Sequence, residues 1–435
     1  MPRTRRVGSG ASITTPPYFG SVLGIDTAPK EPRRLPRWRE LRTVLPGWPR
    51  LGGARRVADA ADVEDLRRLA MKRAPRMVFD YVDGAAEGER SMARAVEAFG
   101  RVEFRPRVLR DVAEAPTAVE ILGRRIAMPV VLGPTGFTRM MHRAGERAVA
   151  RAAERAGVPY TLSTMGTTTA QDVAAAAPGG WNWFQLYVVR ERARTLETLS
   201  LARDAGMDVL VVTVDVPVAG ARLRDVRHGL TVPPSLRWRS VLQALRRPAW
   251  WFDFVTSEPL RFATVDGAPD DLAGITNVMF DPSVTIKDLE WIRSAWQGQL
   301  LVKGVQRVDD AKDLAAVGVD GLVVSNHGGR QLDRSPTPLE LLPEVVDAVG
   351  DRTEVFLDGG VRSGADVAAA VALGARACFI GRAYLYGLMA GGEAGVTRVL
   401  DLLHAELVRT TQLLGVGGVG GVGGLDRDVV RLRPS

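Results

Sequence analysis

The stretch EVFLDGGVRSGADVAAAVALGARACFIGRAYL, residues 354–385, decides the fold. It contains an apolar run with strand character at 354–360, a helical segment at 364–374 and a second apolar run at 377–385. Nearly continuous apolar strands separated by a helix are typical of a parallel sheet that is covered on both faces. The helix is introduced by a capping box, Ser363-Gly-Ala-Asp366. The stretch therefore predicts a strand–helix–strand unit.

The same alternation extends through most of the chain, with helical segments such as 146–157 and 309–318 between the strands and a second capping box at Thr285–Asp288. The strand candidates are 128–135, 158–165, 182–188, 208–217, 299–305, 318–326, 354–360 and 377–385. Eight strands close a (β/α)₈ barrel, which typically takes about 250 residues. We therefore expect an α/β fold, a (β/α)₈ TIM barrel with its strands within 128–385.

Helices and one long connection extend this barrel. Residues 62–75 and 75–99 read as amphipathic helices, the second interrupted near Gly84, so we place one domain at 57–415. About 80 residues separate strands four and five, far more than a usual connection, and define an insertion at about 230–284. Its Arg- and Trp-rich part, SLRWRSVLQALRRPAWWFDFV (235–255), suits an interfacial membrane segment or a lid over the barrel mouth, and the two are compatible.

The two ends of the chain differ from the domain in composition. Residues 1–56 hold twelve Arg/Lys against three acidic residues, whereas the whole chain carries only +8. We expect this basic extension to be disordered, either simply solvated or in contact with anionic lipid; nucleic acid is less supported because no recognition motif accompanies the charge. The Gly-rich tail 416–435 follows a helix, so its GVGGVGGVGG (415–424) predicts a flexible linker and no dinucleotide site.

The composition also excludes several kinds of protein. A single cysteine, Cys378, rules out a disulfide framework and a cysteine zinc site. His142, His228 and His404 show no ligand spacing, so we predict no metal site. The sequence has no apolar run of about 18 residues and no apolar region behind MPRTRRVGSG, which favours a cytoplasmic location.

Polar residues and glycines gather where the expected strands end, which is the face of a barrel that carries its chemistry. These residues are Thr135, Ser163, Gln185, Tyr187, Thr213, Asp215, Lys303, Ser325, His327, Arg330, Asp358, Arg362, Gly381 and Arg382. Any one of them is more easily explained by structure than by function. Their convergence on one rim predicts a functional site.

Two anion sites are expected on this rim. The glycines of DGGVR (358–362) and of GRAYL (381–385), with Arg362 and Arg382, suit a phosphate group after strands seven and eight. Arg222 and Arg330 each offer a bidentate fork to a carboxylate.

An acid–base pair is expected beside these anion sites. Asp215 could orient His327 and stabilise its protonated form, as is usual for a histidine general base. Lys303, deep in its strand, needs a negative neighbour to justify burial, and a reduced flavin anion would serve.

The stretches SNHGGRQLD (325–333), LVKGV (301–305) and LDGGVRSGADV (357–367) resemble the FMN-dependent α-hydroxy-acid oxidases and dehydrogenases. The resemblance covers about 60–415. TVDVPVAGARLRDVR (213–227) and RPAWWFDF (247–254) look closest to the bacterial respiratory L-lactate dehydrogenases of that family.

The resemblance implies a role for each matched residue. His327 becomes the base that takes a proton from a 2-hydroxy acid, supported by Asp215, and Lys303 stabilises the anionic reduced flavin. The substrate-binding residues become Tyr81, Tyr187, Arg222 and Arg330. FMN would contact Pro134, Thr135, Gly136, Ser163, Gln185, Thr213, Lys303 and Ser325, with its phosphate on Asp358, Gly359, Gly360, Arg362, Gly381 and Arg382.

The function implied is oxidation of L-lactate to pyruvate, with the electrons passed to a quinone or a cytochrome. We expect the enzyme to be a homotetramer at the inner face of the cell membrane. Met165, at a pocket position that is bulkier in some relatives, mildly favours a small substrate. An oxidase using O₂ is the nearest alternative. Arg330 argues against a same-fold enzyme that acts on a peptide-derived redox cofactor precursor. The position of Cys378 argues against an NAD-dependent barrel enzyme, which would need a cysteine in a loop. A non-enzymatic adaptor would depend on residues 1–56 alone.

Overall fold

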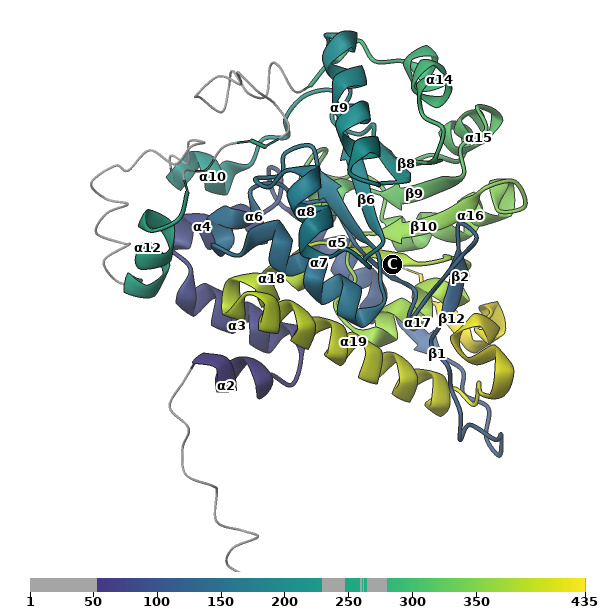
Figure 1. Ribbon diagram of the computed structural model, residues 1–435. Helices are drawn as coiled ribbons and strands as arrows, with labels where there is room; N and C mark the ends of the chain where they lie inside the picture. Colours follow the sequence, from purple (N-terminus) through teal and green to yellow (C-terminus); the bar gives the residue numbers. More distant parts are fainter. Residues whose placement is uncertain (1–52, 229–246, 259, 261, 264–279, 435) are drawn as a thin grey trace, which may run out of the picture. The chain divides into compact units, whose positions relative to one another are not determined.

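Eight parallel strands form a closed barrel in the computed structural model, which describes residues 53–228, 247–258, 260, 262–263 and 280–434 (Figure 1). Around the barrel the order is β10-β11-β4-β5-β6-β7-β8-β9. The bounds are β4 Val130–Leu132, β5 Tyr160–Ser163, β6 Asn182–Leu186, β7 Val209–Thr213, β8 Gln299–Val305, β9 Gly321–Ser325, β10 Glu354–Asp358 and β11 Cys378–Ile380. The predicted fold class is confirmed, because each strand lies within its predicted segment.

The strand register places polar residues of neighbouring strands side by side. Ser163 pairs with Gln185, and Thr213 pairs with Lys303. Asp358 pairs with Ser325 in the same way. Since parallel strands end on one rim, the register alone brings these side chains to one level.

The barrel interior is filled with side chains, and it is closed at the end where the strands begin. It contains Val131, Trp183, Val209, Val211, Leu301, Val323, Phe356 and Phe379. A hairpin of β2 (Val119–Ile121) and β3 (Arg124–Ile126) adds Ile121 and Ile126 to this cluster. Its turn has two residues at positive φ, Leu122 and Gly123, and the Leu122 N–H donates to the Glu354 carboxylate at 3.0 Å. The closed end leaves the opposite rim for chemistry.

Helices cover the outside of the barrel. They are α7 Gly145–Ala156, α8 Ala170–Ala176, α9 Arg192–Asp204, α14 Ile286–Ala295, α15 Val308–Ala316, α16 Pro338–Val349, α17 Gly364–Ala372, α18 Arg382–Gly391 and α19 Glu393–Leu413. Both predicted capping boxes are present, at Thr285 and at Ser363.

The N-terminal helices are α2 Gly53–Ala58, α3 Val63–Arg73, α4 Arg76–Asp83 and α5 Arg90–Gly100. The helix α3 packs on α18, which packs on α19 (Figure 1). The break at Gly84 between α4 and α5 is as predicted. The helix α2 begins at Gly53, four residues before the predicted start of the domain at 57; residues 1–52 of the basic extension lie outside the described residues.

The C-terminal segment is not the flexible linker that its composition predicted. Residues Gly418–Gly424 form a 3₁₀ turn, and β12 (Val430–Leu432) pairs antiparallel with β1 (Val102–Phe104). Val422 is fully buried, and its N–H donates to the Pro116 carbonyl at 2.9 Å. The glycines let the backbone approach the loop before β2 closely, which anchors Val422.

Only part of the predicted insertion is described. The helix α10 (Leu223–His228) precedes it, and α12 (Pro248–Val255) lies within it. Trp250 of α12 is buried and donates its indole N–H to the Met140 carbonyl at 3.1 Å. Most of the predicted segment 235–255, including 235–246, lies outside the described residues. Within the described part of the chain, no helix combines the length and the apolarity needed to span a membrane.

Candidate active site

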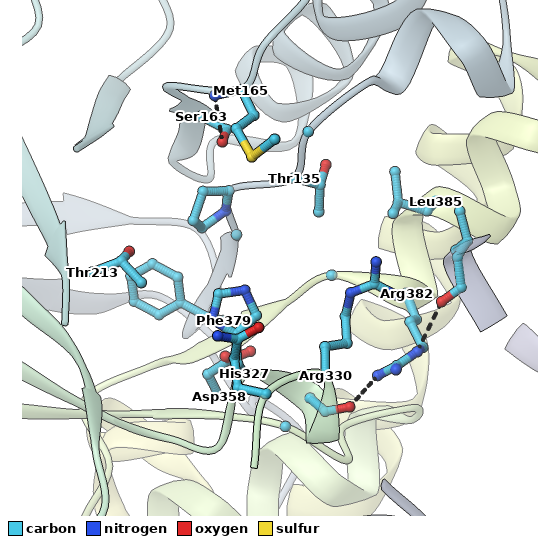
Figure 2. A pocket seen from close by; sticks show the side chains of 18 of the residues that line it. Thr135, Ser163, Met165, Thr213, His327, Arg330, Asp358, Phe379, Arg382 and Leu385 are labelled. Carbon is cyan, nitrogen blue, oxygen red and sulfur yellow. Dashed lines mark hydrogen bonds between the residues drawn. The ribbon is translucent and has the colours of Figure 1, made fainter. Parts of the chain in front are cut away.

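One pocket opens at the rim where the strands end, and most of the predicted site residues line it (Figure 2). These are Tyr81, Pro134, Thr135, Gly136, Ser163, Tyr187, Thr213, Arg222, Lys303, His327, Arg330, Asp358, Gly359, Gly360, Arg362, Gly381 and Arg382. The other three, Gln185, Asp215 and Ser325, do not line it but hydrogen-bond residues that do. The expected convergence is therefore observed.

His327 and Asp215 form the acid–base pair of the pocket. The His327 Nδ1 lies 2.9 Å from the Asp215 Oδ1, and the Asp215 side chain is only 3% exposed. His327 takes a left-handed backbone conformation, with φ of 56°, and its N–H donates to the Ser325 hydroxyl at 3.0 Å. A carboxylate on Nδ1 keeps that nitrogen protonated, so Nε2 is left to accept a proton.

Lys303 has a carboxylate partner that the sequence analysis did not assign to it. Its ammonium lies 2.6 Å from the Asp358 Oδ2 and 3.0 Å from the Ser325 hydroxyl, which itself donates to Asp358 at 2.6 Å. Burial by itself raises the pKa of Asp358, but the Lys303 charge and these hydrogen bonds hold it below its ordinary value. The Asp358 side chain is therefore engaged by Lys303, which leaves the backbone of the DGGVR loop for a phosphate.

Arg222 and Arg330 face the same aromatic ring. Their guanidinium carbons lie 5.7 and 5.0 Å from the centre of the Tyr81 ring. Arg330 donates to the Tyr81 carbonyl at 2.6 Å and to the Gly84 carbonyl at 3.2 Å. Burial and the nearby Arg222 charge lower the pKa of Arg330, as expected for two cations that share a confined space. An anionic ligand between them would relieve this repulsion.

Glycines and two more arginines line the other side of the pocket. Gly359 and Gly360 have φ of 113° and 89°, conformations that suit glycine. Arg382, at the first turn of α18, donates to the carbonyls of Val82 and Gly328 at 3.0 and 2.8 Å (Figure 2), and burial lowers its pKa to about 10. The Arg362 guanidinium lies 5.1 Å from the centre of the Tyr386 ring. A helix N-terminus, a glycine turn and two guanidiniums are suited to a phosphate group.

Unpaired polar atoms near the pocket suit the ring of a flavin. The Gln185 Nε2 and the Thr213 hydroxyl are buried and find no hydrogen-bond partner among the described residues. Gln185 itself is oriented, because its Oε1 accepts from the Ser163 hydroxyl at 3.0 Å. Buried polar groups are normally paired, so these atoms are expected to meet a polar ligand. The residues present thus fit FMN, with polar groups for its ring at one end of the pocket and a phosphate site at the other.

Sequence reasoning missed two residues that support this site. The Tyr384 hydroxyl contacts the Thr135 hydroxyl at 2.5 Å and donates to the Gly133 carbonyl at 2.9 Å, which fixes the loop after β4. Gln331 donates to the Asp215 and Val218 carbonyls at 3.3 and 2.9 Å. Both residues lie inside the motifs quoted above, so their place beside the predicted residues was the available signal.

Fold and pocket together define a barrel enzyme that binds a phosphorylated cofactor and an anionic substrate. The sequence model of the FMN-dependent dehydrogenase family matches residues 70–431. The "Putative L-lactate dehydrogenase" of Mycobacterium tuberculosis (strain ATCC 25618 / H37Rv) is 52% identical over 386 residues, which are 88% of this chain and 93% of that protein. The "L-lactate dehydrogenase" of Caulobacter vibrioides (strain NA1000 / CB15N) is 46% identical over 359 residues, 81% of this chain and 93% of that protein.

The solved structures point to the same family. The crystal structure of monotopic membrane protein (S)-mandelate dehydrogenase superposes with a TM-score of 0.81 at 38% identity, over 86% of this chain and 100% of that one. This chain belongs to the FMN-dependent dehydrogenase family. It is an FMN-dependent hydroxy-acid dehydrogenase.

Proposed function

We propose that this enzyme oxidises L-lactate to pyruvate and passes the electrons to a quinone or a cytochrome. The observation that carries the proposal is that one pocket holds both a carboxylate-paired imidazole, His327, and two guanidiniums by the Tyr81 ring, those of Arg222 and Arg330. A 2-hydroxy acid presents a transferable proton beside a carboxylate, which matches these two features. The relatives named for L-lactate, at 52% and 46% identity, support lactate as the acid.

In this proposal the chain's own residues bind the substrate and move its proton. Arg222 and Arg330 hold the carboxylate, and Tyr81 and Tyr187 contact the substrate oxygens. The His327 Nε2 takes the hydroxyl proton, and the Asp215 carboxylate stabilises the imidazolium that results. Fixing the carboxylate also orients the 2-carbon, so that a bimolecular encounter becomes effectively unimolecular.

FMN, when bound, supplies the two-electron acceptor. We propose that its ring is held by Pro134, Thr135, Gly136, Ser163, Gln185, Thr213, Lys303 and Ser325. We propose that its phosphate meets the backbone of Asp358, Gly359 and Gly360, the N-terminus at Gly381, and the side chains of Arg362 and Arg382.

Two bulky side chains in the pocket, Met165 and Phe280, support a small substrate. Gly136 packs so closely on Met165 that a Cβ at position 136 would lie 2.9 Å from the Met165 Cβ. The mandelate dehydrogenase among the structural relatives makes an aromatic 2-hydroxy acid the competing substrate.

The described part of the insertion supports a peripheral position on the inner face of the cell membrane. In α12, Phe252 and Val255 are each 66% exposed, whereas Trp250 anchors the helix to the domain. Exposed apolar side chains beside basic residues suit an interfacial contact with anionic lipid. The structural relative described as a monotopic membrane protein supports the same position. We further propose a homotetramer, on the family resemblance alone.

Steady-state kinetics with two substrates and two acceptors test the proposal. We expect kcat/KM for L-lactate to exceed that for (S)-mandelate, pyruvate to form in equal amounts with reduced quinone, and little peroxide to appear in air. A preference for (S)-mandelate would contradict the substrate. Peroxide formed in equal amounts with product would instead identify an oxidase.

A further inference from the structure

The short helix α10 carries a site residue at its start but is not held by apolar packing. Arg222 lies just before α10, after an irregular segment that leaves β7 at Thr213. The only buried residue of α10 is Asp225, and Leu223 and Val226 are 39% and 73% exposed. The position of Arg222 must therefore be fixed by polar contacts. The Arg222 guanidinium lies 3.3 Å from the Oδ2 of the buried Asp225 of α10.

The helix itself is joined to the other side of the rim by Arg224, which reaches three carboxylates there. Its guanidinium lies 2.9 Å from Asp83 Oδ2 and 3.3 Å from Asp80 Oδ1, and it also contacts Glu89. His228, at the end of α10, lies 2.7 Å from Asp80 Oδ2. The side chains of Asp80 and Asp83 are only 3% and 7% exposed, so these are largely buried charges, which structures retain only when they are paired. Together they join α10 to α4.

The helix α4 and the turn after it also carry the partners of the other site cations. Tyr81 of α4 gives its ring to Arg222 and its carbonyl to Arg330. The Gly84 carbonyl accepts from Arg330 at 3.2 Å and from Arg382 at 2.7 Å. The contacts of Arg224 therefore connect the element that bears Arg222 to the element on which Arg330 rests.

We propose that Arg224 is a positioning residue, which sets the separation of Arg222 and Arg330 and so tunes the affinity of the pocket for the carboxylate of a 2-hydroxy acid. The inference rests on the proposed function, since it assigns the carboxylate to these two guanidiniums. Arg224 lies beside the pocket without lining it, so its effect on the substrate is indirect. We expect displacement of α10 to move Arg222 without moving His327, which follows β9.

The chain offers a matched control at the same carboxylate. Arg67 of α3, an element other than α10, contacts this carboxylate with its Nε 2.6 Å from the Asp83 Oδ1. The variants Arg224→Gln and Arg67→Gln therefore each remove one cation from Asp83, but only the first releases α10. Arg224→Lys keeps the charge but loses the planar guanidinium that reaches several carboxylates at once, so it should give an intermediate effect. It also provides a variant that retains the fold.

The test measures binding of oxalate, a carboxylate with no hydrogen to transfer, through the absorbance of bound FMN in the holoenzyme. We expect Arg224→Gln to raise the Kd of oxalate about 10–100-fold, the range for weakening one hydrogen-bonded contact to a charged group, with FMN content unchanged. The KM for the hydroxy acid should rise in parallel while kcat changes little. Arg67→Gln should bind oxalate as the wild type does.

A double variant decides whether the effect passes through Arg222. If it does, the double variant should bind oxalate with nearly the same Kd as Arg222→Gln alone. Equal oxalate affinity in Arg224→Gln and Arg67→Gln, or full additivity with Arg222→Gln, overturns the inference alone. A wild-type holoenzyme that binds no carboxylate overturns the proposed function, and the inference with it.

Discussion

The His327 Nδ1 lies 2.9 Å from the Asp215 Oδ1, although the two residues are 112 positions apart. Asp215 follows β7 and His327 follows β9, so the pair forms only because β7, β8 and β9 are neighbours in the closed barrel. The Asp215 Oδ2 finds no hydrogen-bond partner among the described residues, so the imidazole is its main partner.

Replacing His327 removes the proposed base. We expect His327→Gln to keep FMN and to lose turnover by about 10²–10⁴-fold, the usual contribution of general-base catalysis. Absorbance of the purified protein gives the FMN content, and initial rates give the turnover. His404→Gln is the matched control, because His404 contacts Thr117 on another part of the domain. Normal turnover in His327→Gln would remove this residue from the mechanism.

Changing Asp215 tests the pair itself. In Asp215→Asn the amide no longer stabilises an imidazolium and can favour the wrong tautomer of His327, so we expect kcat to fall by about 10²–10⁴-fold. The substrate KM should change much less, since Asp215 does not line the pocket. Asp208→Asn, just before β7, is the control; Asp208 accepts from the Trp181 indole. The interpretation fails if Asp215→Asn turns over at the wild-type rate.

Lys303 and Asp358 are expected to depend on each other for stability. Removing one partner of a buried ion pair leaves an uncompensated charge, which costs about 3–5 kcal/mol. We therefore expect Lys303→Met and Asp358→Asn each to lower the free energy of unfolding of the FMN-free protein. The double variant should lose clearly less than the sum of the two, as measured by urea unfolding. Additive losses would show that the 2.6 Å contact carries no coupling.

His142 is expected to make stability depend on pH. Burial, together with the charge of Arg73, lowers the pKa of His142 from 6.5 to about 4, and its Nδ1 accepts from the Ala144 N–H at 3.2 Å. The unfolded chain binds this proton more tightly than the folded one. The contribution of neutral His142 to the free energy of unfolding is therefore fully present above pH 6.5 and is lost as the pH falls toward 4.

The free energy of unfolding should fall by up to about 3 kcal/mol because of this one group. Urea unfolding of wild type and His142→Gln between pH 7 and pH 4 measures it, since the difference between the two curves isolates the imidazole. Parallel curves would contradict this assignment.

The barrel was predictable because its determinants are local. Each strand, such as 209–213, is a short apolar run, and each capping box specifies a helix start within four residues. Once the strands are placed, polar residues after them must share a rim. That is why His327, Lys303 and Asp215 could be grouped from the sequence.

What could not be predicted depends on partners distant in the sequence. Nothing near Lys303 indicates that its carboxylate is Asp358, because that contact joins β8 to β10, the two strands on either side of β9. The contacts between Arg224 and α4 cross more than a hundred residues. Val422 of the Gly-rich tail is buried because the backbone around it packs on the distant loop at Pro116.

An anaerobic titration of the purified protein with L-lactate tests the central claim most directly. If one pocket brings a carboxylate site and a base to FMN, the visible absorbance of the flavin should bleach in proportion to the lactate added, with one pyruvate formed per FMN. Flavin that stays oxidised with L-lactate and with every other small 2-hydroxy acid, in a protein that holds FMN, would contradict the account.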